Sequence, residues 1–152
     1  PENVGEVAIG GPHVMRGYYK NEAATRGTFK GNLFLTGDLG YLDEDGYLYI
    51  RGRLKELIIR GGQNIYPREV ESAILGHEKV ADTAVIGVPD KFMGERVKAF
   101  IVVKPGFELS ESEIDDYLKE CLASYKVPRL YEFREQLPRN STGKLLKRQL
   151  ES

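Results

Sequence analysis

The pattern of hydrophobic and polar positions changes near Lys55. Before Lys55 the apolar positions form short runs at residues 6–9, 33–35 and 47–50, which glycine-rich turns separate. None of these runs continues with helical spacing, and short runs bounded by turn residues are typical of strands. After Lys55, apolar runs alternate with segments of helical periodicity. We therefore expect β-structure over residues 1–54 and an α+β domain over residues 55–152.

The strongest turn signal in the first part is the polar stretch at residues 43–46. It ends in the pair Asp45-Gly46, and apolar dipeptides at residues 41–42 and 47–48 flank it. An Asp-Gly pair accepts the positive φ angles of a tight turn. The pattern predicts a β-hairpin here.

Two helices are expected in the second part. Pro67 suits a first helical position, where its missing N–H would be unpaired in any case, and Gly76 would end that helix near residue 75. Ser110 followed by Glu113 is a capping-box signature for the second helix, and Pro128 ends that segment. Its apolar stripe has helical spacing and consists of Ile114, Tyr117, Leu118, Cys121, Leu122 and Tyr125.

Strands are expected around these helices, at residues 57–59, 83–88, 97–103 and 130–133. The second part is therefore predicted to be a small domain in which helices flank an antiparallel sheet. Cys121 is interpreted as a small buried residue of the helical stripe rather than a nucleophile, because nothing places either histidine beside it.

Composition narrows the classes of function. The chain is 41% hydrophobic and 30% charged, which is typical of a globular domain. Its net charge of -1 argues against nucleic acid or an anionic membrane surface as a partner. One cysteine permits no internal disulfide, and two distant histidines offer no metal-ligand spacing, so no metal site is expected. The single cysteine makes a reducing cytoplasm the default expectation, and there is no apolar run long enough to span a bilayer. The chain starts at Pro1, so we expect it to be a piece of a longer one.

Three motifs occur in order along the chain: Thr36-Gly37-Asp38, the run at residues 52–71, and the polar turn at residues 138–144, which reads Pro-Arg-Asn-Ser-Thr-Gly-Lys. Together they resemble the C-terminal end of an adenylate-forming acyl-CoA synthetase. The resemblance covers essentially the whole chain. It implies that residues 1–54 are the end of a large N-terminal AMP-binding region, and that residues 55–152 are the mobile C-terminal domain.

The resemblance implies that two residues of the first part bind the nucleotide. Taken alone, Thr36-Gly37-Asp38 is usually a turn, and an arginine such as Arg53 is usually a solvated charge. In the family, the matching aspartate accepts hydrogen bonds from the ribose of ATP, which suits an ionised carboxylate. The matching arginine contacts the ribose or phosphate. Asp38 and Arg53 are therefore expected to bind ATP.

The same resemblance assigns a hinge and a channel to the second motif. It implies that Lys55 is the residue about which the small domain turns, although a lysine at a strand edge is common. Gly61 and Gly62 would otherwise form an ordinary loop. In relatives that use CoA, the second glycine of this loop lines the channel for the pantetheine arm, where a Cβ atom would intrude.

Lys144 follows a glycine, as the lysine of a nucleotide-binding P-loop does. The P-loop requires a glycine where this chain has Pro138, and a serine or threonine where it has Leu145, so the motif is not a P-loop. A lysine in a polar tail is most often a solvated surface residue. In the family, the matching lysine reaches the substrate carboxylate and the α-phosphate of ATP, which implies that Lys144 is catalytic.

The resemblance implies a ligase that uses ATP with Mg²⁺ to form an acyl-adenylate from a fatty or other carboxylic acid, and then transfers the acyl group to CoA. The partner of this chain would be the rest of the same enzyme, so the chain alone is expected to be inactive and to hold no cofactor tightly. Exposed strand edges would favour self-association. Two other interpretations remain open: an adenylation enzyme that loads a carrier-protein thiol, and a non-catalytic interaction module. Residues 17–25 are expected to be a connector without chemistry, and the acyl pocket does not lie in this sequence.

Overall fold

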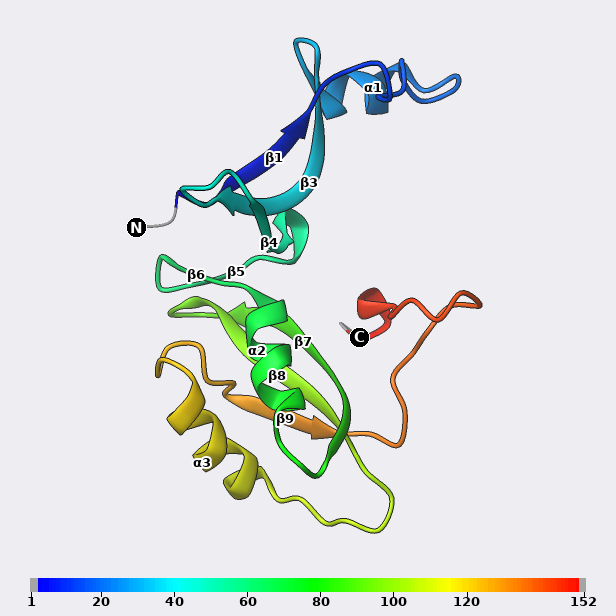
Figure 1. Ribbon diagram of the computed structural model, residues 1–152. Coiled ribbons are helices and arrows are strands. Elements are labelled where there is room, and N and C mark those ends of the chain that lie inside the picture. Colours follow the sequence, from blue (N-terminus) through cyan, green and yellow to red (C-terminus); the bar gives the residue numbers. More distant parts are fainter. Residues whose placement is uncertain (1–2, 151–152) are drawn as a thin grey trace. The chain divides into compact units, whose positions relative to one another are not determined.

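The structure is a computed structural model and describes residues 3–150. Contacts within it divide the chain into two compact units, Pro1–Lys55 and Glu56–Ser152. Figure 1 shows their elements. Each unit is described by itself below.

The first unit is a four-stranded antiparallel sheet organised around its longest strand. The strands are β1 (Gly5–Ile9), β2 (Phe29–Lys30), β3 (Leu33–Leu42) and β4 (Leu48–Arg53). Strand β3 pairs with each of the other three. The hairpin between β3 and β4 is confirmed: Asp43 Oδ1 accepts hydrogen bonds from the N–H groups of Asp45 and Tyr47, and Gly46 has a φ of 83°.

A short helix, α1 (Glu22–Thr28), overlaps the end of the stretch expected to be a connector. The side chain of Asn21 caps it by accepting a hydrogen bond from the N–H of Ala24 at 3.0 Å. The helix has seven residues and buries none of them, so it has no apolar stripe that could have revealed it. This helix was not predicted from the sequence, and the expectation that residues 17–25 carry no chemistry stays a prediction.

The second unit is a five-stranded sheet with two helices. Its strands are β5 (Ile58–Arg60), β6 (Gln63–Ile65), β7 (Val80–Asp90), β8 (Gly94–Val103) and β9 (Leu130–Phe133). The order is β6-β5-β8-β7, and β9 also pairs with β8. All pairs are antiparallel except β8 with β9, which is parallel. The predicted α+β class with an antiparallel sheet and flanking helices is confirmed, with β9 as its parallel member.

Both predicted helices are present, and their local signals explain their bounds. Helix α2 (Pro67–Leu75) begins with Pro67 and ends at Gly76. Helix α3 (Glu111–Cys121) is capped by Ser110, whose side chain accepts a hydrogen bond from the N–H of Glu113.

Helix α3 ends earlier than its apolar stripe suggests. Leu122 is already extended, with a ψ of 150°, so the stripe buries only Ile114 and Leu118 within the helix. Cys121 is the last helical residue and is exposed. The expectation that Cys121 is buried was wrong: it lies in the last turn of the helix, next to the point where the chain becomes extended, and is exposed.

Alternating side chains of β7 and β8 build two separate cores. On one face, Val85, Val97, Ala99 and Ile101 pack with residues of α2 and α3. On the other face, Ala84, Ile86 and Phe100 pack with Leu137 and Leu150 from the C-terminal segment. Helices therefore cover one face of this sheet, and the tail of the chain covers the other. The tail ends in η2 (Lys147–Leu150), a short 3₁₀ helix whose buried residue is Leu150.

Candidate functional site

Asp38 and Arg53 lie opposite each other on neighbouring strands. They are register partners of β3 and β4, so their side chains project from the same face of the sheet. Arg53 Nε lies 2.8 Å from Asp38 Oδ1, and both side chains remain partly exposed, at 58% and 31% respectively. A carboxylate has two oxygens, so this ion pair leaves Asp38 able to accept further hydrogen bonds.

The backbone around Asp38 is fixed by side chains of β1 and β3. Thr36 Oγ1 donates to the carbonyl of Val7 at 2.8 Å and accepts from the N–H of Asp38 at 3.1 Å. Glu6 Oε1 accepts from the N–H of Gly37, which has a φ of 74°. The Thr36-Gly37-Asp38 motif is therefore an irregularity inside a strand rather than a free turn.

Lys55 is exposed and lies in η1 (Leu54–Glu56), a short 3₁₀ helix. It is the last residue of the first unit. A junction between two compact units is where a change in backbone angles alters the fewest contacts.

Gly61 and Gly62 form the turn between β5 and β6, with φ angles of 57° and 79°. Both values are in the region that favours glycine. The N–H of Gly61 donates to the carbonyl of Met93 at 2.8 Å, and a Cβ atom on Gly61 would lie 2.6 Å from Met93 Cε. A Cβ atom on Gly62 would meet open space. The backbone angles therefore favour glycine at both positions, and a Cβ atom on Gly61 would also displace the flexible end of the Met93 side chain.

The turn that carries Met93 is held by a carboxylate. Asp90 Oδ1 accepts hydrogen bonds from the N–H groups of Phe92 and Met93, each at 2.8 Å, and Asp90 Oδ2 pairs with Arg96. The Arg96 side chain and these two N–H groups lower the pKa of Asp90 to about 2. Asp90 therefore remains ionised and positions the neighbour of Gly61.

Lys144 lies at the base of a small hairpin closed by the bridge between Arg139 and Leu145. The side-chain oxygen of Asn140 organises the hairpin by accepting hydrogen bonds from Thr142 N, Thr142 Oγ1 and Lys144 N, the last at 2.8 Å. Gly143, with a φ of 81°, completes the turn. Lys144 is exposed, and its ammonium has no polar partner within residues 3–150. A preformed hairpin thus presents an uncompensated positive charge to solvent.

The structure brings some of the predicted residues together and leaves others apart. Asp38 and Arg53 form one pair in the first unit. Gly61 and Gly62 form one turn in the second unit, while Lys144 stands on a separate hairpin of that unit. Sequence reasoning missed Asn140 and Met93. An asparagine in a polar turn commonly caps backbone N–H groups, which is a signal that could have identified Asn140, whereas nothing local indicated Met93.

Residues 3–150 contain no group of three or more His, Cys, Asp or Glu side chains that could hold a metal ion. No step through Mg²⁺ is therefore assigned to this chain. No helix in the same range is long and apolar enough to cross a membrane.

Relatives of this chain are ligases. The chain is 47% identical over 150 residues to a long-chain-fatty-acid–CoA ligase from Bacillus subtilis, which covers 99% of this chain and 27% of the relative. It is also 47% identical over 150 residues to a 2-succinylbenzoate–CoA ligase from Bacillus licheniformis, covering 99% of this chain and 31% of the relative. The chain thus spans about a third or less of the length of these relatives.

Solved structures give the same answer for the fold. An o-succinylbenzoate CoA synthetase from Bacillus subtilis in complex with its acyl-adenylate intermediate matches with a TM-score of 0.93 and 44% identity, over 100% of this chain and 31% of that one. The same synthetase in complex with ATP and magnesium ion matches with a TM-score of 0.91.

A family model matches the part of the chain that holds most of these features. It describes the AMP-binding enzyme C-terminal domain and covers residues 69–144, from the first turn of α2 to the exposed lysine. The order of the three motifs, the lysine hairpin and this match agree, and the chain belongs to the family of AMP-binding enzyme C-terminal domains.

Proposed function

We propose that this chain is the C-terminal part of an ATP-dependent acid–CoA ligase. The observation that carries the proposal is the Lys144 hairpin, which holds an exposed ammonium without a polar partner among the described residues. In the reaction, a carboxylate oxygen attacks the α-phosphorus of ATP, and the bond to pyrophosphate breaks. The thiolate of CoA then attacks the acyl carbonyl, and the bond to AMP breaks.

Lys144 serves the first of these steps. A carboxylate and the α-phosphate are both anionic and repel each other as they approach. A positioned ammonium offsets that repulsion and stabilises the charge that develops in the transition state. Because the hairpin is preformed, the lysine backbone does not have to be ordered when substrate binds.

Asp38 and Arg53 bind the ribose side of the nucleotide. The ion pair with Arg53 uses Asp38 Oδ1, so the other carboxylate oxygen can accept hydrogen bonds from ribose hydroxyls. Arg53 holds the carboxylate in place and adds a permanent positive charge near the phosphates. The strand register supports these roles, because it places the two side chains together without any ligand.

The Gly61-Gly62 turn serves the second step, as part of the channel for the pantetheine arm of CoA. The open space at Gly62 supports this role, since the turn leaves room for a ligand to approach the backbone. Lys55 acts as the hinge that lets Lys144 act first and the glycine turn second. Its place at the end of a compact unit supports that role.

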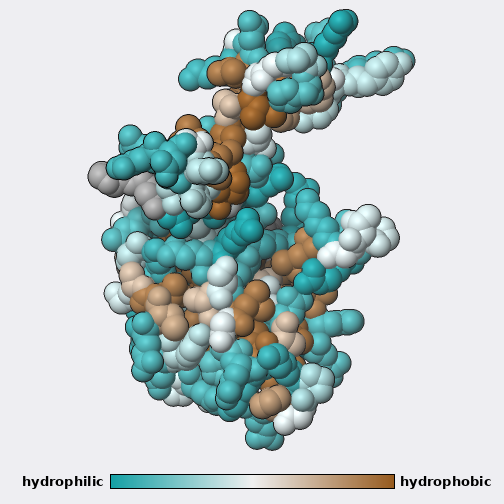
Figure 2. All heavy atoms as spheres, viewed as in Figure 1, coloured by the Kyte–Doolittle hydropathy of each residue, from teal (hydrophilic) through white to brown (hydrophobic). Residues whose placement is uncertain are grey.

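The partner of this chain is the remainder of the same enzyme, which supplies the acid and the other contacts to ATP. The first unit exposes large apolar side chains of β3 and β4, including Leu42, Leu48, Tyr49 and Ile50, which suit such a partner. Figure 2 shows hydrophobic residues, in brown, at the surface of the face that it draws. The isolated chain would then have no adenylating activity, and its exposed strand edges would favour self-association.

The test is the activity of the full-length enzyme with a panel of fatty and other carboxylic acids. Acid-dependent release of pyrophosphate, followed by formation of a CoA thioester, is the expected result. A thioester formed only on a holo-carrier protein would favour the carrier-loading alternative, and an inactive full-length protein would favour the non-catalytic module. Acid-dependent pyrophosphate release by the isolated chain would contradict the division of labour described above.

A further inference from the structure

The segment that carries Lys144 has little regular structure of its own. Between the end of β9 at Phe133 and η2 it forms only the small hairpin. Apolar side chains hold it on the sheet at three places: Leu137 and Leu150 are buried in the second core with Phe100, and the partly buried Leu145 packs against that core. A further contact joins Arg139 Nη2 to Asp82 Oδ2 at 2.6 Å. The position of the hairpin therefore depends on a few side-chain anchors.

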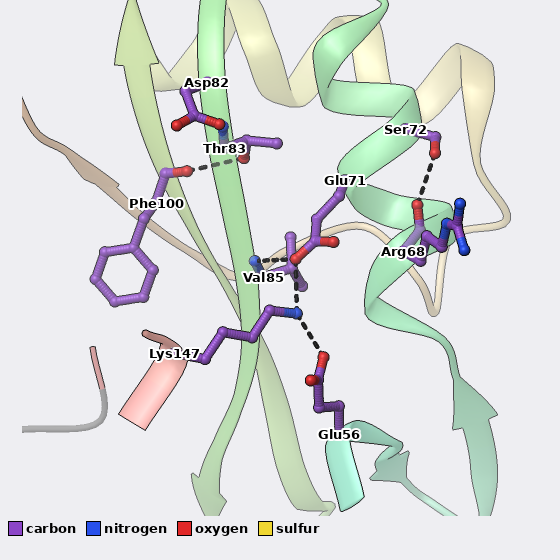
Figure 3. A network of polar contacts seen from close by, with 9 residues as sticks. All are labelled: Glu56, Arg68, Glu71, Ser72, Asp82, Thr83, Val85, Phe100 and Lys147. Atoms are coloured by element: carbon purple, nitrogen blue, oxygen red, sulfur yellow. Dashed lines mark hydrogen bonds and ion pairs between the residues drawn. The ribbon is translucent and has the colours of Figure 1, made fainter. Parts of the chain in front are cut away.

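Lys147 forms the polar anchor on the other side of Lys144. Its Nζ atom lies 2.8 Å from Glu56 Oε2 and 2.8 Å from Glu71 Oε1. Figure 3 shows the ammonium between these two carboxylates. Glu71 Oε1 also accepts a hydrogen bond from the N–H of Val85 at 2.9 Å. Lys147 thus ties η2 to the middle of α2, to the outer strand β7 and to the residue that follows Lys55.

This ion-pair network differs from an ordinary surface pair. The side chains of Lys147 and Glu71 are only 18% and 19% exposed. Exposed pairs contribute little to stability, whereas removing one partner of a largely buried pair leaves the other charge uncompensated. Loss of Lys147 would leave two carboxylates facing each other, and Glu71 would keep only its contact with the N–H of Val85.

We propose that Lys147 is a positioning residue that sets the location of Lys144 during adenylation, acting through Glu71 and Glu56. This inference rests on the proposed function of Lys144. Three residues of chain span at most about 11 Å, so a displacement of Lys147 passes directly to Lys144. The contact with Glu56 also links the hairpin to the segment next to Lys55, and the hairpin therefore moves together with α2, β7 and the start of the second unit.

If Lys147 served only the stability of the fold, its replacement would destabilise the whole second unit and damage both half-reactions. Leu137 and Leu150 remain buried when Lys147 is replaced, so the tail should stay on the sheet while the hairpin loses its fixed position. The expected result is a loss in the step that uses Lys144, not a general loss of folding.

The first test uses amide hydrogen exchange on the chain itself. Lys147→Met should speed the exchange of the N–H groups of Asn140 and Leu146, which donate to Lys144 O and Pro138 O, by about tenfold. Lys147→Arg should restore slow exchange, because a guanidinium can also bridge two carboxylates. Lys119→Met removes a lysine that pairs with Asp115 and Asp116 on α3, and it should leave these amides unchanged.

The second test uses the full-length enzyme. Lys147→Met should slow acyl-adenylate formation about tenfold to a hundredfold, as a small misplacement of a catalytic group does. Conversion of supplied acyl-adenylate to thioester should stay within about twofold. Glu71→Gln keeps an acceptor for the N–H of Val85 but removes the charge, and it should have the same bias. In a Lys144→Ala background, Lys147→Met should cause no further loss, since it acts through Lys144.

Equal loss in both half-reactions, a Lys147→Met effect that adds fully to that of Lys144→Ala, or unchanged exchange in the hairpin would each overturn the proposal. Failure of the unaltered enzyme to release pyrophosphate with any acid would instead overturn the proposed function. The exchange result would then decide by itself whether Lys147 fixes the hairpin.

Discussion

The two units of this chain hold their functional residues in different ways. In the first unit, Leu39 is the one hydrophobic residue among those described that is buried, and much of the sheet is exposed. The second unit has two cores, one on each face of its sheet. Asp38 and Arg53 nevertheless form an ion pair at 2.8 Å, because they are register partners of β3 and β4. Strand pairing and the hydrogen bonds of Thr36 and Glu6 therefore position the first site, whereas the Lys144 hairpin depends on core packing and ion pairs.

The largest expected difference between the two units is in the free energy of unfolding that each loses when a buried side chain is truncated. Phe100 is fully buried between β7, Leu137 and Leu150, so Phe100→Ala should lower the free energy of unfolding of the second unit by about 3–5 kcal/mol. Leu39→Ala should lower that of the first unit by about 2 kcal/mol or less, near the bottom of the range for such changes. Urea unfolding followed by amide signals from each unit measures both values.

A control for this comparison is Ile59→Ala, since Ile59 is half exposed. It should change the stability of the second unit by about 1 kcal/mol or less. If Leu39→Ala and Phe100→Ala had equal effects, or if the amides of the first unit were the better protected ones, the first unit would have a core that its burial does not show.

The second contrast concerns catalysis. In the full-length enzyme, Lys144→Ala should slow acyl-adenylate formation about a hundredfold to a thousandfold, the usual effect of losing one positioned electrostatic contact. Thioester formation from synthetic acyl-adenylate should be largely retained, because the carboxylate has already reacted. Pyrophosphate release and thioester formation measure the two steps separately. Lys119→Ala is the matched control, and equal damage to both steps by Lys144→Ala would leave Lys144 as a structural residue.

Local signals in the sequence predicted the second unit better than the first. Pro67 with Gly76, and Ser110 with Glu113, mark helix ends through contacts within a few residues, so they could be recognised without the fold. Helix α1 could not be recognised in this way, because its only local signal is the capping residue Asn21 and it has no apolar face. The apolar stripe was extended to Leu122 and Tyr125, beyond the point where the chain leaves the helix, and helical spacing alone did not indicate that Cys121 in its last turn is exposed.

The candidate site shows the same limit. The motif residues could be named from the sequence, but the pairing of Asp38 with Arg53 depends on the register of β3 with β4. The contact of Lys147 with Glu56 joins residues 91 positions apart. No pattern within a short window predicts contacts of that kind, and the anchor of the Lys144 hairpin became visible only in three dimensions.

The glycine turn gives a smaller contrast within the second unit. Gly62→Leu should slow thioester formation about tenfold, by crowding the route of the pantetheine arm, and should leave acyl-adenylate formation nearly unchanged. Gly106→Leu is a matched control, because Gly106 also has a positive φ, at 84°, and open space around its Cβ position. Both variants carry similar backbone strain, so a slower thioester step in both would mean that strain, and not the channel, is responsible.

The smallest expected effect concerns pH and the turn beside Gly61. The pKa of Asp90 is lowered from 3.8 to about 2 in the folded chain, mainly by Arg96 and then by the N–H groups of Met93 and Phe92. A carboxyl group with a lowered pKa in the folded state stabilises that state fully above its unfolded pKa, and the contribution is lost as the pH falls from about 4 to about 2.

Asp90→Asn should therefore reduce stability at neutral pH and should lose this part of the pH dependence. Asparagine can still accept hydrogen bonds from the N–H groups of Phe92 and Met93, but it cannot pair with Arg96 as an ion. The urea midpoints of the unaltered chain and of Asp90→Asn are measured from pH 5 to pH 2, and the difference between them is followed. Taking the difference removes the contributions of Asp115 and Glu132, whose pKa values are also lowered and which are present in both chains. The difference should narrow as the pH falls. A difference that stays constant over this range would show that Asp90 stabilises the turn through hydrogen bonds alone, and that its charge has no part in holding Met93 beside Gly61.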